Sequence, residues 1–250
     1  MIDFHSHVLP GIDDGAKDIK TSLQMLLDSF EQGVEVVVAT PHCHLVGKNS
    51  VDTFLKKRKE SYDKLIEAIE KDGRKFPKII LGCELRVANE YPEAEDLKKL
   101  CIENTNYIMV EMPYEKWNPG NYDFIYALIL RGMRPIVAHL ERYFDQHDDF
   151  HNLYSLDLLY QVNAQSFVRS PAKRKIPKLF EEGAIHIIGS DMHDMENRPS
   201  YMKKAANKIT KAYGGYRLKY LMKNADRILN NESVETMCFG KLGLWDMLRL

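Results

Sequence analysis

Residues that can bind a metal ion recur along this 250-residue chain, each near the end of an apolar segment. His5 and His7 form a His-x-His pair where the first such segment ends. Because strand side chains alternate with period two, both imidazoles would face the same side and could hold one cation. Later segments lead to six more candidates: His42, Glu84, Glu111, His139, Asp191 and His193. This recurrence predicts a multinuclear metal site.

The ligand types indicate which metals would bind. Imidazole and carboxylate together suit Mn²⁺, Fe²⁺ or Zn²⁺ in a hydrolytic site, where the cations activate water. A structural zinc site is disfavoured, because such sites are closed, rich in cysteine and built from one or two short loops. His44 is an alternative ligand or a substrate contact. His147, His151 and His186 are better explained as structural histidines.

Seven segments that are rich in Val and Ile, or almost continuously apolar, predict strands buried on both faces of a parallel sheet. They are Ile2–His5, Val34–Thr40, Lys78–Glu84, Tyr107–Glu111, Arg134–His139, Leu158–Asn163 and Ala184–Ser190. Segments with helical spacing or helix-start signals alternate with them: Asp18–Gln32, Val51–Lys71, Pro92–Leu100, Tyr122–Leu130, Pro171–Glu182 and Met202–Tyr213. This alternation predicts a βα fold.

The positions of the ligands distinguish a barrel from an open sheet. An open sheet binds its ligand at one crevice, where the strand order reverses. Here six of the seven expected strands end in a candidate ligand, so their carboxyl ends must converge. A closed barrel achieves this, because its active site lies at the carboxyl ends of the strands. We therefore expect an α/β fold that is a distorted seven-stranded (β/α) barrel with the metal site at that end.

No repeat, low-complexity tract or Pro/Ser-rich linker divides the chain, so we expect a single domain over residues 1–250. Residues 232–250 form an apolar C-terminal tail. We expect this tail to pack across the barrel wall. A surface for a partner or for self-association is the alternative.

Composition limits the partners and the compartment. Thirty-five Lys and Arg balance 36 Asp and Glu, which argues against a nucleic-acid partner. The N-terminus lacks the features of a signal peptide, and no apolar run approaches about 18 residues, so no membrane insertion is expected. The four cysteines are scattered, which is typical of reduced thiols and predicts a cytoplasmic protein.

Six motifs carry a resemblance to known proteins. Three resemble the PHP (polymerase and histidinol phosphatase) superfamily: His-Ser-His-Val-Leu-Pro-Gly-Ile-Asp-Asp-Gly-Ala-Lys-Asp (His5–Asp18), Ala-Thr-Pro-His (39–42) and Gly-Cys-Glu (82–84). Three more closely resemble its bacterial metal-dependent protein-tyrosine phosphatases of capsule and exopolysaccharide systems: Ala-His-Leu-Glu-Arg-Tyr (138–143), Gln-Val-Asn-Ala-Gln-Ser (161–166) and Gly-Ser-Asp-Met-His (189–193). The resemblance runs from Met1 to about Asn231.

The resemblance implies two to three divalent ions, with Mn²⁺ favoured over Fe²⁺ or Zn²⁺. The first position would have His5, His7, Glu84 and Asp191; the second Glu84, Glu111 and His139; the third His42, His193 and Asp14. Other branches of the superfamily use a histidine in place of Asp14. Asp13 is adjacent, and an Asp-Asp-Gly stretch also fits a simple turn. Asp14 could instead act as a general acid.

The resemblance makes Arg142 and Arg198 phosphate binders, because planar guanidinium groups suit phosphoryl oxygens. Without it, an arginine in such a loop is more often merely solvated. Arg86 is a weaker rival for this role. Asn163 could orient water or substrate, or could serve only in a turn.

The resemblance implies a cytoplasmic metal-dependent phosphomonoesterase that acts on phosphotyrosine in proteins, with the tyrosine autokinase of a polysaccharide export system as its partner. Cysteine-based phosphatase chemistry needs a Cys-x₅-Arg loop. The residues six beyond Cys43, Cys83, Cys101 and Cys238 are Asn49, Asn89, Tyr107 and Leu244, so this chemistry is excluded. Two alternatives are a small-molecule phosphatase of the superfamily, such as a histidinol phosphatase, and a non-catalytic adaptor that binds phosphotyrosine.

Overall fold

The computed structural model describes residues 1–46, 50–92, 96–143, 158–169 and 184–234, together with residues 153, 156, 176 and 179. Nine strands occur in these residues: β1 (Ile2–Ser6), β2 (Val36–Ala39), β3 (His42–Cys43), β4 (Lys78–Leu81), β5 (Glu84–Arg86), β6 (Tyr107–Glu111), β7 (Arg134–Val137), β8 (Leu159–Asn163) and β9 (Ile187–Gly189). The helices are α1 (Ile19–Glu31), α2 (Ser50–Asp72), η1 (Leu97–Leu100), α3 (Pro119–Leu130), η2 (Leu140–Tyr143), α5 (Ala164–Val168), α7 (Met202–Tyr213) and α8 (Gly215–Leu229).

The strands form two parallel sheets, in the orders β1-β2-β4 and β3-β5-β6-β7-β8-β9. The expected strand Lys78–Glu84 is split into β4 and β5, and the short β3 follows the expected strand Val34–Thr40, which is why nine strands are found instead of seven. Pro41 separates β2 from β3 and cannot donate to a strand ladder. Gly82 lies in the break between β4 and β5, closely packed against Val38 and Ile102. The bends carry the residues beyond them into the second sheet.

The last strand returns to the first. The backbone N–H of Asp191 donates to the carbonyl of His5 over 2.8 Å, and that of His7 donates to Met192 over 3.0 Å. Gly189 permits this approach, because a Cβ atom there would lie 2.5 Å from the Cβ of His5. The structure is therefore an α/β fold whose parallel strands curl into a half-barrel, which confirms the expected fold class at this level.

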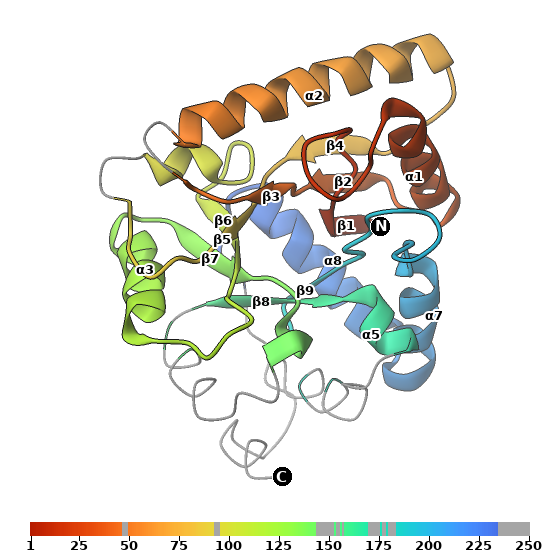
Figure 1. Cartoon of the computed structure of the whole chain (residues 1–250). Helices are drawn as coiled ribbons and strands as arrows, with labels where there is room; N and C mark the ends of the chain where they lie inside the picture. Colours follow the sequence, from red (N-terminus) through yellow and green to blue (C-terminus); the bar gives the residue numbers. More distant parts are fainter. Residues whose placement is uncertain are drawn as a thin grey trace.

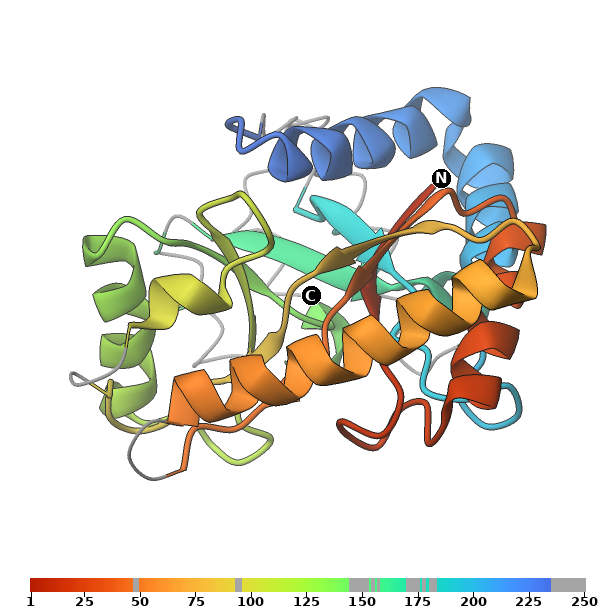
Figure 2. The same cartoon turned by 90° about the horizontal axis from the view of Figure 1, so that it is seen from above.

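Helices cover the strands on both sides. In Figure 2 the strands lie between α2 on one side and the α7–α8 pair on the other. Figure 1 shows α3 beside β7, at the far side from α7. Ala225 and Ile228 of α8 join a buried apolar cluster with Phe4 and Met109, so α8 packs on the strands that carry the site.

Local sequence signals explain α1. Asp18 caps its N-terminus by accepting a hydrogen bond from the Thr21 backbone N–H over 2.8 Å. Met25 and Leu26 are buried on its inner face. Gly33 follows the helix with φ of +84°, a conformation that glycine adopts at little cost. The helix therefore has nearly the bounds expected for Asp18–Gln32.

One expected helix is wrong in extent, one helix was not expected, and two expected segments lie outside the described residues. The helix expected over Pro92–Leu100 is wrong in extent, since the described part is only the short η1, which Asp96 caps. Helix α8 was not expected, although Leu221, Ala225 and Ile228 recur at helical spacing. Apart from residues 176 and 179, the helix expected over Pro171–Glu182 lies outside the described residues, as does the tail beyond residue 234.

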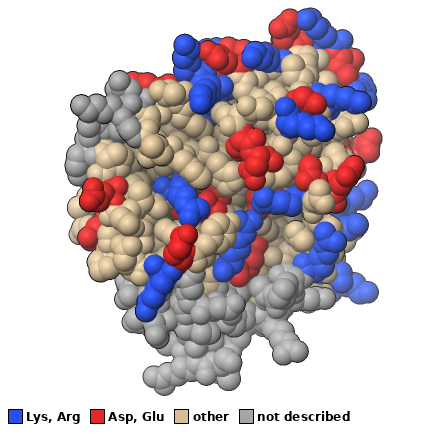
Figure 3. Space-filling model, in the orientation of Figure 1, with Lys and Arg blue, Asp and Glu red and all other residues tan. Residues whose placement is uncertain are grey.

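The described surface carries charges of both signs. Lys and Arg are interspersed with Asp and Glu over the face in Figure 3, as the near-neutral net charge predicts. Among the described helices, none has both the length and the apolar character needed to cross a membrane.

His186 is a buried structural histidine, as expected. It precedes β9, and its Nδ1 accepts a hydrogen bond from the Tyr160 backbone N–H over 3.1 Å. Burial lowers the pKa of His186 to about 4, from the ordinary histidine value of 6.5. Between these values the unfolded chain binds a proton that the folded chain does not bind. Stability is therefore lost as the pH falls from about 6.5 to about 4.

Replacing His186 by Asn should remove this pH dependence of stability, because the Asn side chain does not titrate. Its Oδ1 can still accept the hydrogen bond from the Tyr160 backbone N–H. Between pH 7 and pH 4.5 the parent protein should lose roughly 2 kcal/mol more unfolding free energy than the variant. Urea unfolding of both proteins, freed of metal by a chelator at each pH, measures this difference. Equal losses in the two proteins would show that His186 is protonated in the folded state.

Candidate metal centre

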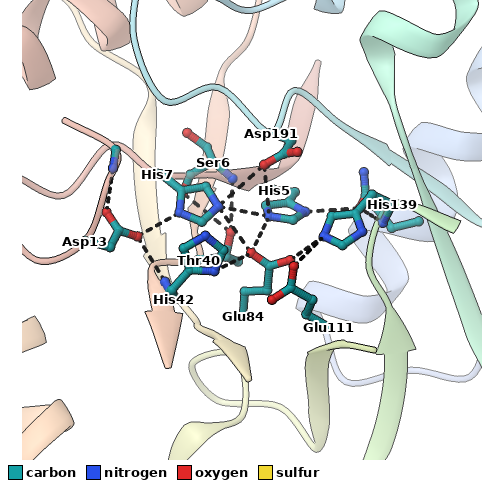
Figure 4. A network of polar contacts seen from close by, with 12 residues as sticks. His5, Ser6, His7, Asp13, Thr40, His42, Glu84, Glu111, His139 and Asp191 are labelled. Atoms are coloured by element: carbon teal, nitrogen blue, oxygen red, sulfur yellow. Dashed lines mark hydrogen bonds and ion pairs between the residues drawn. The ribbon is translucent and has the colours of Figure 1, made fainter. Parts of the chain in front are cut away.

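All nine predicted ligands lie at one end of the strands. They come from β1, β3, β5 and β6, from the residues just after β7 and β9, and from the loop after β1: His5, His7, Asp14, His42, Glu84, Glu111, His139, Asp191 and His193. Figure 4 shows several of these imidazoles and carboxylates turned toward one another. Parallel strands place their carboxyl ends at the same edge, which explains why residues so far apart in sequence meet here.

Glu84 is at the centre of this cluster and is 1% exposed. Its Oε2 lies 3.2 Å from His5 Nε2, 3.3 Å from His7 Nε2 and 3.1 Å from His42 Nδ1. Its Oε1 lies 2.6 Å from His139 Nε2. One carboxylate thus faces four imidazoles from three separate segments, so Glu84 would contribute to more than one cation position.

The donor atoms form overlapping groups whose members lie within 4.8 Å of one another. The groups are His5, His7 and Glu84; Glu84, Glu111 and His139; His7, Asp14, His42 and His193; and His42, His44 and Glu111. The first three resemble the three expected metal positions, except that His7 also lies near the third. Asp191 Oδ1 lies 3.6 Å from the nearest nitrogens of His5, His7 and His193. His44 stays an alternative ligand.

Asp14 is the outermost of these residues. Its Oδ1 lies 3.4 Å from His42 Nε2 and 3.4 Å from His193 Nε2, yet its side chain is 67% exposed. This position at the rim is compatible with either of the two roles considered, a third-site ligand or a proton donor to a leaving group.

Four histidines are held by their outer ring nitrogens. The Nδ1 of His5 lies 3.1 Å from the Gln161 side chain, and that of His7 lies 2.7 Å from the Asp13 side chain. The Nδ1 of His193 lies 3.1 Å from the Asp191 carbonyl. The His139 Nδ1 lies 3.4 Å from the Tyr143 hydroxyl. Each Nε2 is left to face the cluster. This division of roles is the usual one for histidines that bind metal.

The observed residues therefore fit a set of divalent cations. His193 Nε2 is buried without a hydrogen-bond partner in the described part of the chain. Such an orphaned imidazole nitrogen is costly unless a cation takes its lone pair. The mixed imidazole and carboxylate donors suit Mn²⁺, Fe²⁺ or Zn²⁺.

The electrostatics of the site also favour bound positive charge. Burial disfavours a charged His7, but Asp13 and Glu84 outweigh it and raise the pKa of His7 to about 10. Burial likewise opposes ionisation of Asp13, but His7 outweighs it and lowers the pKa of Asp13 to about 2. Despite burial, His5 and His139 hold the pKa of Glu84 well below its usual value. A divalent cation would take the place of the proton that His7 otherwise binds.

Two of the predicted ligands have unusual backbones. His139 has φ of +36° and Asp191 has φ of +53°, values that cost free energy for residues other than glycine. Their backbone N–H groups donate to Gln161 Oε1 and to the His5 carbonyl, each over 2.8 Å. These bonds hold the strained turns that direct both side chains into the cluster.

Arg142 and Arg198 both reach the cluster through Asp191. Arg198 Nη2 lies 2.7 Å from Asp191 Oδ2, and Arg142 Nη2 pairs with the same oxygen. Asn163 Nδ2 donates to it over 2.7 Å, so Asn163 orients Asp191. The rival Arg86 also contacts a predicted ligand, since its Nη1 lies 3.4 Å from Glu111, and its Nη2 lies 3.6 Å from the exposed Glu115.

A cavity of about 720 Å³ opens over the cluster. Arg142 and Arg198 line it together with Asp14 and His42. Apolar and aromatic side chains also line it: Ile12, Val46, Phe54 and Tyr114. A cavity with a polar floor and apolar walls suits a ligand with one anionic end and one apolar part.

Several residues of the site were missed in the sequence. Tyr114 is 56% exposed in the cavity, and its hydroxyl accepts a hydrogen bond from Arg142 Nη1 over 2.7 Å. Gln161 supports both His5 and His139. Its strand ends without a ligand of its own, which could have indicated a supporting role. Asp13 had been noted only as a neighbour of Asp14.

The described cysteines cannot supply a nucleophile. Cys43, Cys83 and Cys101 are buried and unpaired with one another. Burial raises the pKa of Cys83 well above its usual value and that of Cys101 to about 12, so these thiols stay protonated. Cys238 lies outside the described residues.

Comparison with known proteins identifies relatives along almost the whole chain. The family model described as capsular polysaccharide synthesis, CpsB/CapC, matches residues 1–230. The tyrosine-protein phosphatase YwqE of Bacillus subtilis is 30% identical, over 94% of this chain and 93% of its own. The tyrosine-protein phosphatase CpsB of Streptococcus agalactiae is 26% identical, over 94% of this chain and 100% of its own.

The fold also matches a solved structure. This structure belongs to a study of YwqE from Bacillus subtilis and CpsB from Streptococcus pneumoniae, described as metal-dependent tyrosine phosphatases. It superposes with a TM-score of 0.82 at 26% identity and covers 97% of this chain and 100% of the other. The β-aspartyl dipeptidase of Fervidobacterium islandicum, at 12% identity and a TM-score of 0.53, shares the fold alone.

Proposed function

Because the chain belongs to the CpsB/CapC capsular polysaccharide synthesis family, we propose that it is a metal-dependent protein-tyrosine phosphatase. The observation that carries the proposal is the pair Arg142 and Arg198 beside a cluster of histidines and carboxylates, at the floor of the cavity. Guanidinium groups next to bound cations are what phosphoryl transfer requires.

We propose that the nine residues of the cluster hold two to three divalent ions, with Mn²⁺ first and Fe²⁺ or Zn²⁺ as alternatives. When bound, such ions activate water and neutralise charge on a phosphoryl group. Arg142 and Arg198 would bind the non-bridging oxygens of the phosphate. Asp13 and Gln161 would fix the rings of His7 and His5. We keep Asp14 as either the last ligand or the acid that protonates the departing phenolate.

The phosphotyrosyl ring would lie over the apolar wall of the cavity. Ile12, Val46, Phe54 and Tyr114 line the cavity that also contains the arginines. Because phenolate is a better leaving group than an alkoxide, aryl phosphates should react faster than alkyl phosphates. The natural substrate that we propose is a phosphotyrosyl protein, the tyrosine autokinase of a polysaccharide export system.

We also propose how the barrel closes, how far the domain extends and where the protein acts. The strands form a closed, distorted seven-stranded barrel. This count takes β2 with β3 as one strand and β4 with β5 as another, and the Ser6–Met192 bridge closes the ring. The chain is one domain over residues 1–250, with residues 232–250 as its tail. Its place of action is the cytoplasm.

Competition between two substrates tests the function. We expect the metal-loaded protein to hydrolyse a phosphotyrosyl peptide with a much higher kcat/KM than histidinol phosphate. The variant in which all four cysteines are replaced by serine should keep this activity if it folds. A strong preference for histidinol phosphate would move the protein to the small-molecule branch. Binding of the peptide without turnover would instead support the non-catalytic adaptor.

Tyr114 gives a prediction about substrate binding. Tyr114→Phe keeps the ring but loses the hydrogen bond to Arg142, which should lower kcat about tenfold, corresponding to roughly 1.5 kcal/mol. Tyr114→Ala also removes the ring and should raise KM for phosphotyrosyl peptide. Tyr126 is 51% exposed on α3 and does not line the cavity, so Tyr126→Ala is the matched control. An unchanged KM in Tyr114→Ala would show that the ring does not contact substrate.

A further inference from the structure

A second cavity shares Arg142 and Arg198 with the first. Its volume is about 210 Å³, and η2, β8, α5 and the loop after β9 contribute to it. Arg169 and Ser166 line this second cavity but not the first. The motif Gln-Val-Asn-Ala-Gln-Ser, which supplies no metal ligand, thus provides part of its wall. Two arginines therefore border both the reaction site and a smaller adjoining space.

The second cavity has an excess of positive charge. Three guanidinium groups line it, those of Arg142, Arg169 and Arg198, against the carboxylates of Glu141 and Asp191. Asp191 Oδ2 is shared between Arg142 and Arg198, so one carboxylate serves two cations. Arg169 pairs with no carboxylate in the described part of the chain and stacks over the Tyr201 ring, 4.9 Å from its centroid.

Glu141, the second carboxylate of this cavity, already accepts hydrogen bonds from groups within the protein. Glu141 Oε1 accepts hydrogen bonds from the Asn163 backbone N–H over 3.1 Å and from the Ser166 hydroxyl over 3.0 Å. These bonds satisfy Glu141 locally. The guanidinium of Arg169 and the outward N–H groups of the two shared arginines are therefore the donors available to a ligand.

We propose that this cavity is a subsite for inorganic phosphate on its way out of the reaction site. The inference rests on the proposed function, which generates phosphate beside Arg142 and Arg198. A phosphate that moves between the cavities keeps contact with these two guanidinium groups and then gains Arg169. The smaller volume suits a free oxyanion, whereas the larger cavity has the apolar wall that a tyrosyl ring needs.

Product inhibition by inorganic phosphate tests the proposal in the full-length, metal-loaded enzyme. With phosphotyrosyl peptide as substrate, phosphate should raise the apparent KM and also lower the apparent Vmax, because an occupied subsite delays release. In Arg169→Gln the effect on Vmax should disappear and only competition should remain. Equilibrium dialysis with labelled phosphate should show two bound phosphates per chain in the parent protein and one in the variant.

Arg131→Gln is the matched control. Arg131 stacks on the ring of Tyr91, 4.2 Å from its centroid, but lines neither cavity. This variant should keep the parent's inhibition pattern and two bound phosphates. Loss of the Vmax effect in both variants would point to a general effect of charge and would overturn the proposal.

One bound phosphate in the parent protein, or unchanged inhibition in Arg169→Gln, would also overturn it. A selective loss of kcat/KM for peptides with a second anionic residue, at unchanged phosphate binding, would make the cavity a substrate subsite instead. Failure of the proposed function is distinguishable from these results. A protein that binds two phosphates but hydrolyses no phosphotyrosyl peptide would keep the anion subsite and refute the phosphatase.

Discussion

Replacing Glu84 by Gln is expected to remove most of the bound metal and to lower turnover by at least about 10³-fold. Glu84 is the carboxylate that faces His5, His7, His42 and His139, all within 3.3 Å. Gln preserves the volume of the side chain but not its charge. The remaining donors would then be neutral imidazoles with too few carboxylates to offset the cost of a buried divalent cation.

Elemental analysis and phosphotyrosyl-peptide turnover, on the same preparations, measure this effect. Glu67→Gln is the matched control, because Glu67 lies on α2 and pairs with Lys71 at the surface. It should keep both metal and activity. Circular dichroism establishes whether Glu84→Gln has folded. A folded Glu84→Gln protein with the parent's metal content and turnover would contradict the proposed role of Glu84.

The second large effect is expected at the arginines. Arg142→Ala or Arg198→Ala should keep the metal but lower turnover by about 10²–10³, corresponding to about 2.7–4 kcal/mol of transition-state stabilisation. Metal should be retained because Asp191 keeps Asn163 and the other arginine as partners in each single variant. Lysine at either position should rescue only part of the rate, since a point charge cannot replace the planar guanidinium group.

The measurement is kcat/KM for phosphotyrosyl peptide together with metal content, with Arg131→Ala as the control remote from both cavities. Near-normal turnover in both alanine variants would show that these arginines do not bind phosphate. Loss of metal together with turnover would assign them a different task, namely holding Asp191 in place.

The sequence predicted the positions of the donor atoms well because of strand geometry. His5, Glu111 and the residues after β7 and β9 all follow from the rule that parallel strands bring their carboxyl ends together. The structure places them in one cluster, centred on Glu84. What these residues bind is a proposal that rests on the family and on the chemistry of the donors.

Other features depend on packing that no local pattern records. Pro41 and Gly82 were visible in the sequence, but the shift of β3 and β5 into a second sheet depends on how the bends pack. Tyr114 acts through Arg142, and its own neighbours in sequence give no sign of this. For Gln161 the available signal was that its strand ends without a ligand. The helical spacing of α8 could have been recognised before the structure was known.

Metal titration of chelator-treated protein tests the central claim most directly. Mn²⁺ would be added stepwise, and bound metal and phosphotyrosyl-peptide turnover would be followed in the same samples. We predict negligible turnover in the stripped protein, then activity that rises with bound metal and reaches its maximum at two to three ions per chain. Full turnover at less than one bound metal ion per chain would contradict a multinuclear metal-dependent phosphatase.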